Sequence, residues 1–278
     1  MLRAVLDRAD EDLEASLRAL RPTHDEVTFA ATLSPRAVAL ARSLGFTRVG
    51  AQSDGRELTV EALTALANAG LTDLHVALYG ASPLMHDYHT ADGSFDGLAA
   101  VLNASRSMQI TSVVTTPLTR SNARSLGELP AWLTAHNVAA WAVAVPRTRG
   151  VRTSAFDRLF PRLALALPYA LHALEQARRR ALPAWIRGAP WCLLGPYATR
   201  SLPESPRAYG GMCEGCSTRS RCPGVDAVYL DRFRGDELSP SRVAALTAQR
   251  IGIREASLAR MLHGTFDPAG LASESTER

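Results

Sequence analysis

The sequence predicts an α/β protein with a parallel sheet or barrel, followed by a separate cysteine-rich region. Two observations lead to this prediction. Between residues 26 and 145, strand-like runs alternate with segments of helical apolar spacing. After Val145 the alternation stops, and all four cysteines of the chain lie between Trp191 and Cys222. We therefore expect a βα-repeat body and a cysteine-bearing appendage.

The predicted elements follow one another regularly. The first is a helix over residues 10–20, where leucines recur at helical spacing and Pro22 marks the end. Strands are then predicted over residues 26–31, 48–52, 73–79, 110–116 and 141–145, and helices over residues 35–44, 60–69, 95–107 and 126–136. Pro35 opens its helix, and Gly45 and Gly70 follow the ends of theirs, as helix capping favours.

The runs 74–78 and 140–145 are almost continuously apolar, which is typical of strands covered on both faces. Parallel α/β folds bind ligands at the carboxyl ends of their strands. The loops after residues 31, 52, 79, 116 and 145 are therefore the candidate binding positions.

The second half of the chain has a different organisation. Residues 159–180 are amphipathic and contain Pro161 and Pro168, which predicts one kinked helix or two helices. A last helix is expected to start at residues 239–242. The predicted divisions are a barrel over 1–150, a helical connector over 151–185, a cysteine-rich region over 186–238, and a C-terminal helix with a tail over 239–278.

Composition limits the partners. The chain is 46% hydrophobic, has no apolar run near the length of about 18 residues that a membrane span needs, and begins without an apolar signal core. We expect a cytoplasmic protein that does not bind a membrane. The net charge is +4, but all 31 basic residues are arginines spread among 27 acids, and the run 178–180 falls at a predicted helix end. Nucleic-acid binding is therefore not predicted.

The cysteines predict a metal site. Cys192 is followed by the run Cys213-x2-Cys216-x5-Cys222. Thiolates are soft ligands that suit zinc and iron-sulfur clusters, and a Cys-x2-Cys turn directs two sulfurs to one metal. Disulfides or buried free thiols are the alternatives. A cysteine cluster in a cytosolic chain favours metal binding over disulfides.

Residues 70–80, 86–95 and 113–122 resemble the middle strands of the radical S-adenosylmethionine (SAM) barrel. Residues 190–238, with the cysteine run and Gly224, resemble the auxiliary cluster region of the SPASM or twitch subgroup. Together the likeness extends from about residue 26 to 238. It implies a partial, open parallel (β/α) barrel of the radical SAM type with a C-terminal cysteine-rich iron-sulfur region.

The chain departs from this family at the catalytic cluster. The family's Cys-x3-Cys-x2-Cys motif is absent, because no cysteine precedes Cys192. The Gly-Gly-Glu segment, expected near residues 29–35, is also missing, and Ala77 replaces a serine. Of the cofactor shell, the resemblance leaves Gly55 and Asn122 as cofactor-binding candidates. SAM binding is therefore left open, and SAM cleavage by this chain alone is not expected.

The family's first strand has no predicted counterpart before residue 26. The strand over 26–31 is therefore expected to be an open sheet edge, covered by the helix 10–20, by a second copy or by a partner chain.

The fourth metal ligand has two candidates. The SPASM pattern has a further cysteine where this chain has Asp226, so either Asp226 is a ligand or Cys192 completes one four-cysteine site. The all-thiolate site is preferred because its ligands match in softness. His86-x2-His89 with Asp87 is a weaker metal candidate.

Three functions are compatible with these residues. The first is a non-catalytic iron-sulfur protein with one auxiliary [4Fe-4S] cluster, which serves a catalytic radical SAM partner or binds a peptide or small-molecule substrate. The second is a diverged or truncated radical SAM enzyme. The third is an interaction module stabilised by Zn²⁺ in place of the cluster.

Overall fold

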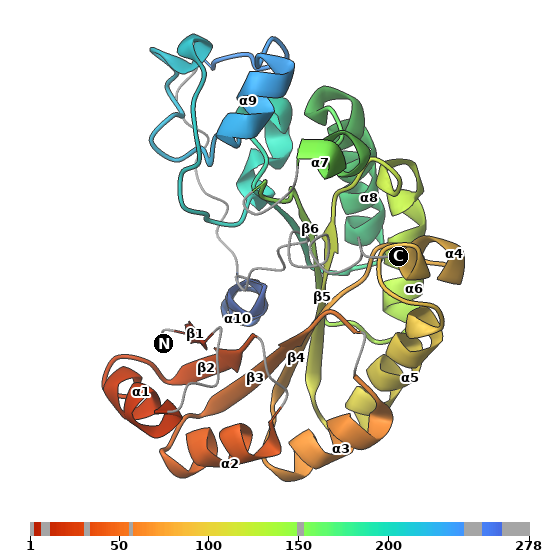
Figure 1. Cartoon of the computed structure of the whole chain (residues 1–278), viewed down its shortest axis with the longest axis vertical. Coiled ribbons are helices and arrows are strands. Elements are labelled where there is room, and N and C mark those ends of the chain that lie inside the picture. The colour runs from red at the N-terminus through yellow and green to blue at the C-terminus, as the bar shows by residue number, and fades with distance from the viewer. Residues whose placement is uncertain are drawn as a thin grey trace.

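A seven-stranded sheet forms the centre of the computed structural model, which describes residues 3–6, 12–30, 34–55, 58–148, 153–241 and 252–262. Every neighbouring pair of strands is parallel, and the strands are ordered as they occur in the chain. They are β1 (Arg3–Leu6), β2 (Glu26–Phe29), β3 (Arg48–Ser53), β4 (Asp73–Ala77), β5 (Thr111–Pro117), β6 (Ala140–Ala144) and β7 (Ala184–Arg187). Strands β1 and β7 do not pair with each other, so the described sheet is an open half-barrel (Figure 1).

Helices cover the convex face of this sheet. The described helices are α1 (Leu13–Leu20), α2 (Pro35–Ser43), α3 (Val60–Asn68), α4 (Pro83–Asp87), α5 (Ser94–Ser107), α6 (Leu129–Ala135), α7 (Thr153–Leu159), α8 (Leu163–Arg179), α9 (Ala227–Phe233) and α10 (Ile253–Met261). Figure 1 shows α1, α2, α3, α5, α6 and α8 around the outside of the curve. Within the described residues, none of these helices has the length and apolar character that crossing a membrane would require.

The main core lies between the convex face of the sheet and these helices. Val27, Val49, Leu74, Val114 and Trp141 all point to this side and are fully buried. The strands were expected to be covered on both faces, and they are, because α10 lies on the concave face (Figure 1). This arrangement is a parallel half-barrel of the predicted class.

The prediction that residues 26–31 form the sheet edge is wrong. Strand β1 pairs in parallel with β2, and α1 follows it, so the first βα unit is present. Four residues are too few to show a strand period, and long-range ion pairs hold this strand in place. The Arg3 guanidinium reaches Glu26 at 2.9 Å and Asp73 at 2.5 Å, and the side chains of all three residues are almost fully buried.

Strand β7 was not predicted either, because it is a four-residue run inside the expected connector and cysteine region. The amphipathic stretch 159–180, expected to form one kinked helix or two, contains the end of one helix and a second helix. Helix α7 ends at Leu159, Pro161 lies in the break, and α8 continues with Pro168 inside it. The helix expected to start at residues 239–242 is not helical over 239–241, and residues 242–251 lie outside the described part; the described helix there is α10.

The Asp73→Asn substitution tests the ion cluster that Asp73 forms with Arg3, Glu26 and Arg48. Removing the charge leaves Arg3 and Arg48 without their shared carboxylate, so the free energy of unfolding is expected to fall by about 3 kcal/mol in urea denaturation. Asp92→Asn, at an exposed loop position, is the matched control and should change stability by less than about 0.5 kcal/mol. Equal stability of the two variants would contradict a structural role for this cluster.

Candidate metal centre

Short turns position the cysteines beyond β7. Cys192 lies in η2 (Trp191–Leu193), and Cys213 ends η4 (Gly211–Cys213). The Cys216 N–H donates to the Cys213 carbonyl at 3.3 Å, which closes the turn between these two residues. Gly224 follows Cys222 with φ +67°, and a Cβ there would lie 2.2 Å from a backbone oxygen. Glycine is therefore required at this position.

All four cysteines line one small cavity, together with Pro190, Tyr209 and Thr218 among others. Each thiol is free and partly buried. The backbone N–H groups of Trp191 and Gly224 both donate to the Cys222 sulfur at 3.4 Å. Such N–H to sulfur hydrogen bonds stabilise a thiolate, and in iron-sulfur clusters they also shift the reduction potential. The predicted four-cysteine set therefore meets around one space.

The described side chains do not form a closed coordination shell. Within the described ranges, no three His, Cys, Asp or Glu side chains are positioned to hold a metal ion as they stand. The donor set and its shared cavity suit a soft metal, and ligation would require the thiols to draw closer together. The prediction that Cys192, Cys213, Cys216 and Cys222 bind one metal stays a prediction.

The thiols affect one another's ionisation. Burial raises the pKa of Cys192 and of Cys222, and the neighbouring thiols raise both pKa values further. Hydrogen bonds from Thr218 lower the pKa of Cys216, so Cys216 ionises before these two. Cysteine ligands must be deprotonated to bind a metal. The positive charge of a bound cation would then offset the repulsion between the thiolates.

Asp226, the alternative fourth ligand, does not line this cavity. Its carboxylate accepts the Thr148 N–H at 2.6 Å and lies 3.8 Å from the Arg207 guanidinium. It borders a separate, small pocket with Tyr229. Asp226 therefore ties the cysteine region to the loop after β6.

Asn122 and Gly55, the two cofactor-binding candidates, lie beyond the carboxyl ends of β5 and β3. The fully buried Asn122 amide donates to Tyr79 O at 2.9 Å and to Pro117 O at 2.8 Å, and its carbonyl accepts the Thr119 N–H. Both N–H donors are thus engaged in tying β4 to β5. Gly55 adopts φ +91°, and its N–H donates to Ser53. The contacts of Asn122 and the backbone conformation of Gly55 therefore give each residue a structural role without a bound cofactor.

The two histidines after β4 do not meet at a metal site. His86 is fully buried, and its Nδ1 accepts the Tyr79 N–H at 3.2 Å. His89 stacks on the Tyr79 ring at 4.5 Å and bonds to Ser121. Asp87 instead caps the start of α5 through the Gly93 and Phe95 N–H groups. Burial is the main cause that lowers the pKa of each histidine to about 4.

The sequence interpretation missed a set of polar residues on the concave face. His75 Nε2 bonds to Thr115 at 2.8 Å, and burial, followed by Arg187 and Arg3, lowers the pKa of His75 well below its usual value. The signal was the alternation of polar residues in β2 and β4, which read Glu-Val-Thr-Phe and Asp-Leu-His-Val. That period places every second side chain on the concave side.

Helix α10 occupies the concave face. Leu258, Ala259, Met261 and Leu262 pack against Val113, Ala140, Ala142 and Trp185. Arg260 pairs with Glu26 at 3.5 Å, and Arg48 donates to Ser257 at 3.1 Å. The chain's own helix thus fills the inner side of the half-barrel that a ligand could otherwise enter.

Comparison with known proteins gives likeness of fold only. No family model and no curated protein matches the chain. SuiB from Streptococcus suis matches with a TM-score of 0.52 at 11% identity over 66% of this chain and 49% of SuiB. SuiB bound to S-adenosylmethionine gives 0.52 at 10% identity, over 66% and 50%. SuiB bound to its precursor peptide SuiA gives 0.50 at 11% identity, over 66% and 48%.

This chain spans about half the length of SuiB. At such low identity the likeness establishes the architecture alone. The expected architecture, a partial, open parallel (β/α) barrel, is confirmed, and SuiB has a similar fold.

The histidines predict a loss of stability in acid. The unfolded chain binds protons near pH 6.5 and the folded chain near pH 4, so stability is complete above pH 6.5 and is lost as pH falls towards 4. The loss is on the order of 3 kcal/mol for the buried His86, and it is smaller for His89 because solvent reaches this side chain in part. Urea denaturation from pH 7 to 4 measures it.

The double variant His86→Asn, His89→Gln keeps one acceptor on each side chain and should flatten this pH dependence. His172→Gln, on the exposed face of α8, should leave it unchanged. An unaltered slope in the double variant would refute the assignment.

Proposed function

We propose that this chain is an iron-sulfur protein on a radical-SAM-type half-barrel, with one auxiliary [4Fe-4S] cluster on Cys192, Cys213, Cys216 and Cys222. It serves as a partner or substrate-binding subunit in the modification of a peptide or small molecule, and it does not cleave SAM by itself. The single observation behind the proposal is that four thiols line one cavity.

The cluster assignment follows from the donors. Four thiolates are the usual ligand set of a [4Fe-4S] cluster, and backbone N–H bonds to Cys222 resemble the hydrogen bonds that tune such clusters. Zn²⁺ accepts the same four ligands in a structural site.

The absence of SAM cleavage follows from the first βα unit and the concave face. The six residues 7–12 between β1 and α1 contain no cysteine, so this connection offers no ligands for a SAM-cleaving cluster. The concave face is packed by α10. The Asn122 amide, a candidate cofactor contact, is engaged by backbone carbonyls.

A role beside a peptide substrate is suggested by the likeness to SuiB, which has been crystallised with its precursor peptide SuiA. The half-barrel edge at β1 is one place where another chain could add. This part of the proposal rests on the fold likeness.

Metal analysis after anaerobic purification tests the cluster. We expect about four irons and four sulfides per chain and a broad absorption near 400 nm that dithionite bleaches. The double variant Cys213→Ser, Cys216→Ser should lose the iron. Ser220→Ala, an exposed neighbour, should retain it. One zinc per chain without sulfide would support the zinc module, and no metal in either form would refute the site.

Reductive cleavage of SAM is tested on the same iron-loaded protein. With dithionite and SAM, we expect no 5′-deoxyadenosine above the level of a protein-free control, because the chain lacks the second ligand set. An intact radical SAM enzyme in the same mixture is the positive control. Turnover by this chain alone would show that it is an enzyme in its own right.

A further inference from the structure

Helix α10 contacts the sheet through an apolar cluster that is separate from the main core. In the described part of the chain, the two sets of buried apolar residues have no member in common. The members of the smaller cluster are Leu258, Ala259, Met261 and Leu262 from the helix and its end, and Val113, Ala140, Ala142, Trp185 and Leu202 from beneath it. Helix α10 is therefore seated on the finished sheet and is not part of its main core.

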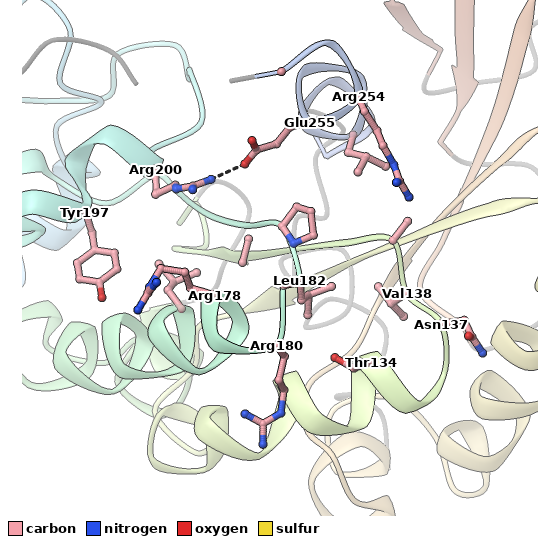
Figure 2. A pocket seen from close by; sticks show the side chains of 17 residues that line it. Thr134, Asn137, Val138, Arg178, Arg180, Leu182, Tyr197, Arg200, Arg254 and Glu255 are labelled. Atoms are coloured by element: carbon pink, nitrogen blue, oxygen red, sulfur yellow. Dashed lines mark hydrogen bonds and ion pairs between the residues drawn. The ribbon is translucent and has the colours of Figure 1, made fainter. Parts of the chain in front are cut away.

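The polar contacts at the two ends of α10 are weak. Glu255 pairs with Arg200 at the start of the helix (Figure 2), and Arg187 donates to the Leu262 carbonyl at its end, at 3.5 Å. The side chains of Glu255 and Arg200 are 28% and 26% exposed. Partly exposed ion pairs add little to stability. These contacts position the helix without fixing it firmly.

The ion pair beneath the last turn of α10 is incomplete. The Arg260 guanidinium lies 3.5 Å from Glu26 Oε1. Both Glu26 Oε1 and Arg260 Nε are buried, yet neither forms a hydrogen bond within the described residues. A buried polar atom without a hydrogen bond destabilises the packed state. The seated position of α10 is therefore less stable than that of a helix with a fully paired interface.

A hollow borders the first turns of α10. This cavity of about 660 Å³ lies between the start of α10 and the ends of α6 and α8 (Figure 2). We call it the arginine-lined cavity, because its lining includes Arg178, Arg180, Arg200 and Arg254. The N-cap of α10 is Gly252, which has no side chain to satisfy the first N–H groups. The start of the helix is thus neither enclosed on this side nor capped.

We propose that α10 is a displaceable plug, and that the concave face beneath it binds a helical peptide segment with one arginine among apolar residues. The inference rests on the proposed role as a partner or substrate-binding subunit. Helix α10 shows what this face accepts. Apolar side chains at positions 258, 261 and 262 lie over small residues of β5 and β6, and the charge of Arg260 is complementary to that of the buried Glu26.

A peptide with the same spacing of apolar and arginine side chains would fit the same groove, as amphipathic helices do in other proteins. Because α10 is part of the same chain, it competes with the peptide at a high effective concentration. The peptide therefore binds only to molecules in which α10 has left the face, and its binding favours that state.

Hydrogen exchange of the unaltered chain tests the displacement. We expect the amides of residues 256–262 to exchange at least about 100-fold faster than those of β5, because local release of α10 leaves the main core packed. The variant Glu255→Gln, Ser257→Ala should speed exchange in α10 at least threefold without affecting β5. The control Glu14→Gln, Ser16→Ala makes the same changes at the same spacing on α1 and should leave α10 unaltered. Equal exchange in α10 and β5 would overturn the plug.

A fluorescently labelled peptide of residues 252–262 tests the groove. The double variant Leu258→Asp, Leu262→Asp should release α10 from the full chain, because unpaired aspartates are too costly to bury there. We expect fluorescence anisotropy to show at least tenfold tighter binding of the peptide to this variant than to the unaltered chain. The control Leu84→Asp, Leu165→Asp changes two exposed leucines and should bind like the unaltered chain.

The charge complementarity is tested by the same peptide with Arg260→Glu, which should bind the released variant at least tenfold more weakly. Absence of peptide binding to the folded variant, or equal binding to the variant and the unaltered chain, would overturn the proposal. Circular dichroism checks that the variant is folded; if it is not, hydrogen exchange of the unaltered chain decides. Both measurements are made on metal-free and iron-loaded protein, so failure of the metal site and failure of the groove give different results.

Discussion

The described half-barrel depends on the ion pairs of one buried carboxylate, that of Asp73. It pairs with Arg3 of β1 and with Arg48 of β3, so it joins the edge strand to the middle of the sheet. Arg48 then contacts Ser257 and Met261 of α10. Burying each ion costs several kcal/mol, which only a complete set of partners offsets. One cluster of ion pairs and hydrogen bonds therefore connects β1, the middle of the sheet and α10.

The concave face is a packing surface for α10. Strands β5 and β6 contribute small side chains there, Val113, Ala140 and Ala142, and these leave room for a helix. Helix α10 fills this space with apolar side chains, while its Arg260 and Ser257 contact the ion cluster. With the inner side of the half-barrel filled in this way, the four cysteines lie outside it, beyond the end of β7. The cysteine cavity is lined by none of the α10 residues that fill that inner side.

The cysteine region depends on both local and distant contacts. The turn from Cys213 to Cys216 is a local feature, whereas Gly224 is required by the close approach of the Ala208 carbonyl from an earlier segment. Cys192 instead reaches the cavity because β7 leads directly into η2. The carboxylate of Asp226, which sequence spacing left as an alternative ligand, is drawn away by the Thr148 N–H. This backbone contact is one that the sequence alone does not show, and the fourth metal ligand stays a prediction.

The sequence by itself determined the parallel βα alternation from β2 to β6 and the grouping of four cysteines, because periodicity, helix caps and cysteine spacing are local signals. Only the tertiary structure decided that β1 joins the sheet, since Arg3 is held by acids 23 and 70 residues away. The same holds for β7, whose four residues show no period, and for α10. The arginine-lined cavity exists because distant elements meet, and no pattern within one element encodes such a meeting.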